Sequence, residues 1–92
     1  MPEFIIGDLL VRRQLLRLVG KILIQRKIRI IQEQVINSLN FFENLAALIA
    51  YSNNISDTID RLSRETIRIL GQAPTEVLQA YVQQNLHELN GF

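Results

Sequence analysis

The side chains that perform acid–base or nucleophilic chemistry are few and scattered in this sequence. His87 is the single histidine, and there is no cysteine. Nucleophilic catalysis needs a nucleophile with a base held beside it, and no such partner is grouped with His87. The four glycines are isolated from one another, so a glycine-rich phosphate-binding loop is missing as well. We therefore expect a protein that is not an enzyme and that uses no cofactor and no metal.

The closest grouping of acidic residues is explained by local pairing better than by metal binding. Asp57 and Arg61, Asp60 and Arg64, and Arg61 and Glu65 are each four positions apart. Residues at that spacing lie on adjacent turns of one helix face, where opposite charges stabilise the helix modestly. We expect a solvated row of ion pairs there.

The cationic residues concentrate in the first part of the chain. Residues 1–36 carry seven Lys and Arg against three Asp and Glu, a net charge of +4, whereas residues 37–92 carry a net charge of −3. This asymmetry indicates either attraction between the two halves, within one chain or between two, or an anionic partner such as a nucleic acid or a membrane surface. The residues expected to contact an acidic partner are Arg12, Arg13, Arg17, Arg26 and Arg29.

Apolar residues recur at helical spacing along most of the chain. The pattern predicts helices over residues 4–19, 21–51, 55–70 and 74–89. Asparagines at positions 53 and 54 are expected to end the second helix, and Gly71 and Pro74 separate the last two. A competing interpretation is a strand over residues 21–31, since isoleucines there alternate with polar residues and favour strands.

The second expected helix contains a heptad-like seam, in which apolar positions alternate steps of three and four with Ser38 as the one polar member. At 1.5 Å per residue, residues 21–51 would form a helix about 46 Å long. A compact globule of 92 residues has a diameter of only about 32 Å, so a second copy is expected to cover the part that projects. The predicted dimer interface is Ile28, Ile31, Val35, Phe42, Leu45 and Ile49. The alternative is a bend within residues 21–51 that gives a monomeric bundle, although no Pro or Gly is available there.

These observations predict an all-α fold in a single domain, residues 1–92, with one long central helix and three shorter helices, in a homodimer. The longest fully apolar run covers residues 45–51, far shorter than the roughly 20 residues of a membrane-spanning helix. We expect a soluble, cytoplasmic protein–protein interaction module, a small adaptor or regulator that binds itself and another protein. The alternative is a nucleic-acid-binding regulator that uses the same arginines. The sequence identifies neither the partner nor the pathway.

Overall fold

The computed structural model describes the backbone of residues 2–90 and the side chains of residues 7–90. It contains three α-helices, α1 (Pro2–Ser38), α2 (Leu45–Gln72) and α3 (Thr75–Gln84), followed by a short 3-10 helix, η1 (Leu86–Glu88). No strand occurs in this part of the chain. The all-α prediction is therefore confirmed, and the strand alternative for residues 21–31 is wrong because that segment lies inside α1.

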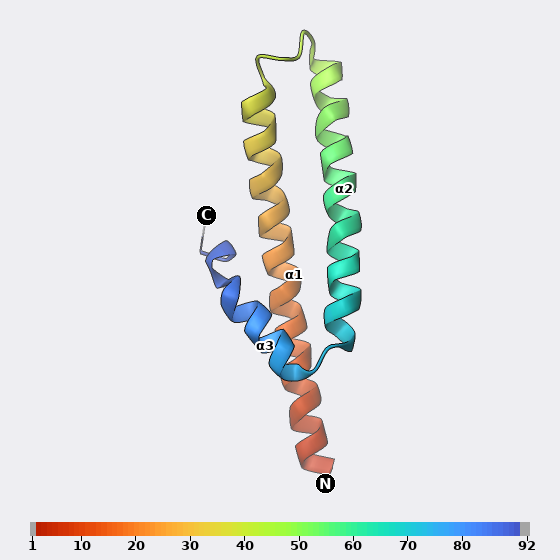
Figure 1. The fold of residues 1–92 in the computed structure, drawn as a ribbon, viewed down its shortest axis with the longest axis vertical. Coiled ribbons are helices and arrows are strands. Elements are labelled where there is room, and N and C mark those ends of the chain that lie inside the picture. The colour runs from red at the N-terminus through yellow and green to blue at the C-terminus, as the bar shows by residue number, and fades with distance from the viewer. Residues whose placement is uncertain (1, 91–92) are drawn as a thin grey trace.

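The first two helices form an antiparallel hairpin, and α3 packs along α1 (Figure 1). The molecule measures 63 × 23 × 14 Å, and its radius of gyration is 17.1 Å. A compact chain of this length would have a radius of gyration of about 12 Å. The structure is therefore an elongated, thin layer of helices with a high ratio of surface to volume.

The prediction of a long helix over residues 21–51 is wrong. Instead α1 continues through Gly20 to Ser38, a turn follows, and α2 continues through Asn53 and Asn54. Gly20 has open space around it, and one glycine costs a helix only about 1 kcal/mol. Without Pro or Gly, the chain breaks at residues 39–44, where Asn44 adopts an extended conformation and its side chain accepts a hydrogen bond from the Ala47 amide (2.8 Å). An asparagine at this position stabilises a new helix start.

The boundary between the last two helices lies close to where the sequence places it. After α2 ends at Gln72, Ala73 is extended, and Pro74 stands directly before α3. The last predicted helix is nevertheless shorter than expected, because α3 ends at Gln84 and the chain tightens into η1. This change rotates the final residues, so that Leu86 is exposed and Glu88 is buried.

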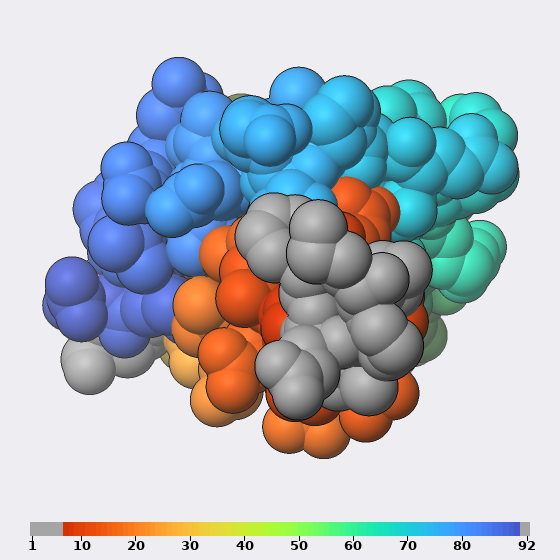
Figure 2. Space-filling view, turned by 90° about the horizontal axis from the view of Figure 1, so that it is seen from below, coloured from red at the N-terminus to blue at the C-terminus, as the bar shows by residue number. Residues whose placement is uncertain are grey.

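The hydrophobic core lies where all three helices meet, near the end of the hairpin away from the turn. It consists of Val19, Ile22 and Leu23 from α1, Leu70 from α2, and Leu78 and Val82 from α3. The turn end of the hairpin has no fully buried side chain among the described residues, because only two helices are present there. Figure 2 shows that α2 and α3 cover one side of α1 and leave the opposite side uncovered.

Candidate functional site

A buried carboxylate joins the C-terminal segment to the first helix. Glu88, in η1, is only 4% exposed, and two arginines of α1 surround it. Its Oε1 accepts hydrogen bonds from Arg29 Nη2 (3.0 Å) and Arg26 Nε (3.3 Å), and its Oε2 accepts one from Arg29 Nε (3.3 Å). These bonds, first the one from Arg29, hold the pKa of Glu88 below its ordinary value, against the opposing effect of burial. We call Arg26, Arg29 and Glu88 the C-terminal clamp.

Further contacts connect the basic N-terminal half to the later part of the chain. Arg26 also donates to the Tyr81 hydroxyl (3.3 Å) and to Asn85 Oδ1 of the C-terminal segment. Lys27 of α1 donates to Asp60 of α2 at 2.7 Å. The two oppositely charged halves therefore attract each other within one chain, which is one of the alternatives that the charge asymmetry left open.

Arg12 holds the turn between α2 and α3. Its Nη1 donates to the Ala73 carbonyl (2.8 Å) and to Thr75 Oγ1 (3.2 Å), and its Nη2 donates to the Gly71 carbonyl (3.0 Å). The last carbonyls of a helix lack partners inside that helix, so a guanidinium at this place satisfies them and opposes the negative end of the helix dipole. Arg12 thus has a structural role.

The five arginines expected to bind a partner fall into two groups. Arg12, Arg26 and Arg29 are engaged within the chain, as described above. Arg13 and Arg17 are exposed, and together with Lys21 they form a row at four-residue spacing on α1. None of these three cations takes part in an ion pair with any side chain of residues 7–90. Arg13 and Arg17 remain the predicted contacts for an acidic partner.

The acidic residues of α2 do not form the pairs that their spacing predicts. Asp60 bonds Lys27 of α1, and Glu65 pairs with Arg68 three positions on. His87 is exposed, with its Nε2 3.7 Å from Glu88. Among the described residues, no group of three or more His, Cys, Asp or Glu is placed to hold a metal ion.

Two rows of residues, apolar on α1 and partly polar on α2, run along the side of the hairpin that lies away from α3. On α1, Lys27 and Gln34 reach α2, and Ile30 lies between the helices. On each helix, the residues that follow the inward-facing ones by one position point about 100° away from the other helix. In an antiparallel pair, this displacement turns both rows to the same side. The rows are Ile24, Ile28, Ile31 and Val35 on α1, and Leu45, Ile49, Ser56, Ser63 and Ile67 on α2, where Asp60, bonded to Lys27, lies between the two serines.

We call these nine residues the back face. Ile24, Ile28, Leu45, Ile49 and Ile67 are between 40% and 69% exposed, which is a high value for large apolar side chains that lie on one side of the hairpin. Five of the six residues predicted for the dimer interface lie on it, although they belong to two helices and not to one. The sixth, Phe42, packs its ring against Tyr51, with the centroids 4.9 Å apart.

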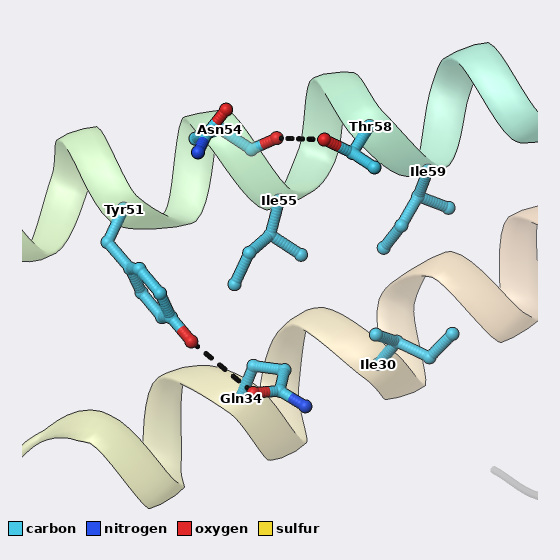
Figure 3. Close-up of a pocket in the computed structure, with 7 residues that line it drawn as sticks. All are labelled: Ile30, Gln34, Tyr51, Asn54, Ile55, Thr58 and Ile59. Carbon is cyan, nitrogen blue, oxygen red and sulfur yellow. Dashed lines mark hydrogen bonds between the residues drawn. The ribbon is translucent and has the colours of Figure 1, made fainter.

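The opposite side of the hairpin has a shallow groove between α1 and α2 (Figure 3). Ile30, Ile55 and Ile59 point into it, and the Tyr51 hydroxyl donates to Gln34 Oε1 (3.3 Å) across its end. This groove lies on the side where α3 packs on α1. The sequence did not single it out, because its lining comes from two helices whose pairing only the fold establishes.

No protein-family model matches the chain, and searches of curated proteins and of solved structures also return no match. Among the described residues, no helix combines the length and the hydrophobicity that are needed to cross a bilayer.

Proposed function

We propose that this protein is a non-enzymatic helical interaction module that acts as a homodimer. The observation that supports the proposal is the amount of apolar surface that one chain leaves uncovered. Of the large hydrophobic side chains in residues 7–90, fifteen are exposed, whereas only six are buried in the core. Such an imbalance is typical of a subunit whose remaining core forms on association.

The areas agree with this interpretation. The chain exposes 6859 Å², whereas a compact monomer of 10.6 kDa exposes about 5,500 Å². The excess is about 1,400 Å² per chain, or about 2,800 Å² for two chains. Obligate homodimers bury roughly 2,000–5,000 Å² in total, so one partner of the same size suffices to cover the excess.

Light scattering coupled to size exclusion tests the proposal. We expect a particle of twice the 10.6 kDa chain mass at micromolar concentration. Because such a dimer is held mainly by apolar contacts, its mass should persist when the salt concentration is raised. A monodisperse, fully helical monomer under these conditions would contradict the proposal.

The exposed row of Arg13, Arg17 and Lys21 supports a second candidate function, nucleic-acid binding. Three cations per chain allow few phosphate contacts, so the affinity would fall only moderately with salt, with a logarithmic slope of about −3 per chain on duplex DNA. Fluorescence anisotropy with a labelled duplex at several salt concentrations measures this slope. If replacement of Arg13, Arg17 and Lys21 by glutamine leaves the affinity for the duplex unchanged, the row does not bind nucleic acid.

A further inference from the structure

We propose that two hairpins pair through their back faces in antiparallel orientation, so that the turn of each chain lies at the basic end of the other. The proposal rests on the homodimer proposed above and specifies which face each copy uses and how the copies are oriented. The two hairpins then form two stacked layers of two helices. In this arrangement α1 lies against α1 of the second copy, α2 lies against α2 of the second copy, and α3 of each copy lies on the outside.

The position of α3 favours the back face over the opposite side. On that opposite side, α3 and η1 pack on α1 and are fixed by the C-terminal clamp. A second hairpin therefore cannot lie flat there along α1. No element of residues 2–90 covers the back face, and Figure 2 shows the uncovered side of α1 away from both other helices. It extends over both helices, with apolar residues from Ile24 to Val35 on α1 and at Leu45, Ile49 and Ile67 on α2.

The size of the α2 residues also favours close approach at this face. Ser56 and Ser63 lie between the larger residues of the α2 row and are partly buried already. Small side chains between large ones give a surface with depressions, into which isoleucines of a second copy can pack. The exposed area of the whole chain exceeds that of a compact monomer by about 1,400 Å², and the back face contributes five of the fifteen exposed large hydrophobic side chains.

The distribution of charge decides the orientation. Arg13, Arg17 and Lys21 continue the α1 row of the back face toward the N-terminus. At the other end of the hairpin, the whole stretch of residues 34–56 contains a single charged residue, Glu43 in the turn. A parallel pairing would bring two sets of three cations together. The antiparallel pairing separates them and places each set beside the turn of the other copy, which carries the carboxylate.

The two-fold axis of this arrangement passes near the middle of the α1 row. Ile28 then lies close to Ile28 and Ile31 of the second copy. About equally far from this centre, in opposite directions along the hairpin, are Arg17 and Glu43. Within one chain, Arg17 lies 21 residues, or about 32 Å of helix, before the end of α1 at Ser38, and Glu43 lies beyond that end in the turn, so only the partner copy can bring them together.

Cysteine cross-linking tests the geometry directly, because the chain contains no cysteine of its own. Single variants Ile28→Cys and Leu62→Cys place one thiol on the back face and one on the opposite side; both positions are exposed, at 40% and 58%. A disulfide needs Cα atoms within about 7 Å. Under mild oxidation we expect a covalent dimer from Ile28→Cys and monomer on a denaturing gel from Leu62→Cys.

The orientation has its own readout. The double variant Arg17→Cys/Glu43→Cys should form intermolecular disulfides in the antiparallel dimer, and neither single variant should do so. If the wild-type protein is dimeric, but Leu62→Cys cross-links and Ile28→Cys does not, the back-face assignment is wrong and the homodimer is still supported. Cross-linking of Ile28→Cys without any in the double variant would overturn the antiparallel orientation. A monomeric wild type would overturn the homodimer itself. Circular dichroism of each reduced variant checks that the helices are intact.

Discussion

Replacement of Glu88 by glutamine removes the charge at the centre of the C-terminal clamp and preserves the shape of the side chain. The carboxylate accepts three hydrogen bonds from Arg26 and Arg29 and is 4% exposed. Hydrogen bonds to charged groups are worth about 1.5–3 kcal/mol each when buried. Both arginines remain partly exposed, at 29% and 40%, and regain water when the carboxylate is lost. We therefore expect Glu88→Gln to lower the free energy of unfolding by about 2 kcal/mol in total.

Thermal unfolding followed by circular dichroism at a fixed protein concentration measures this loss. For a domain of this size, about 2 kcal/mol corresponds to a decrease in Tm of roughly 10 °C. The matched control is Glu33→Gln, because Glu33 pairs with the same Arg29 (3.5 Å) but is 58% exposed. A surface pair of this kind contributes little, so the control should unfold within about 2 °C of the wild type.

The effect of Glu88 should also depend on pH in a defined direction. Its pKa in the folded protein is lowered, so its stabilising contribution is fully present above the ordinary value of 4.5 and is lost as the pH falls through the lowered folded value. The difference in unfolding free energy between wild type and Glu88→Gln should therefore shrink below pH 4.5. Equal stability of the two proteins at pH 7, or a difference that persists unchanged at pH 2, would refute the role assigned to the clamp.

Other parts of the structure lead to further expectations. Ile22→Ala removes a side chain that is 0% exposed at the centre of the core, and chemical denaturation should show a loss of about 3 kcal/mol. Asn44→Ala removes the cap that begins α2 and should cost about 1 kcal/mol in the same assay; no loss would count against a helix start at this position. Arg12→Met retains the apolar stem but frees the carbonyls that end α2, and we expect a loss of about 1–2 kcal/mol. Arg13→Gln together with Arg17→Gln should leave the Tm nearly unchanged, since both side chains are exposed, and should weaken partner binding if the partner is acidic; a large drop in Tm would show that they serve the fold.

The position of the hairpin turn could not be derived from apolar periodicity. The seam from Ile28 to Ile49 keeps its heptad-like steps through residues 39–44, although the helix is interrupted there. The seam residues on either side of the turn lie on the back face, whereas Ser38 and Phe42, which connect them in the sequence, do not belong to it. The signal for the break was the asparagine at position 44, whose side chain caps α2. That signal is ambiguous, since Asn53 and Asn54 lie inside α2 and end nothing.

The roles of the charged residues depended on tertiary structure even more strongly. The sequence alone does not distinguish the pair Arg13 and Arg17 from the pair Arg26 and Arg29 as candidates for partner binding. In the structure, only the second pair faces the segment that contains Glu88. Burial of Glu88 itself follows from the tightening of the chain into η1, which exposes Leu86 in its place. A continuous α-helix over residues 74–89 would place Leu86 on the same face as the buried Val82, but a 3-10 turn rotates each residue further than an α-helix does, and Leu86 is exposed.

The sequence by itself determined that the chain is helical and where its last two helices separate. Local interactions are sufficient for this, since amphipathic spacing, Gly71 and Pro74 act within a few residues. Tertiary structure alone decided where the long apolar segment folds back, which arginines are used inside the chain, and on which side of the hairpin the uncovered surface lies. The use of the arginines depends on contacts between residues about 60 positions apart, such as Arg26 with Glu88 and Arg12 with Ala73. The pairing of α1 with α2 depends on contacts such as that of Lys27 with Asp60. Such pairings leave no periodic trace in the sequence.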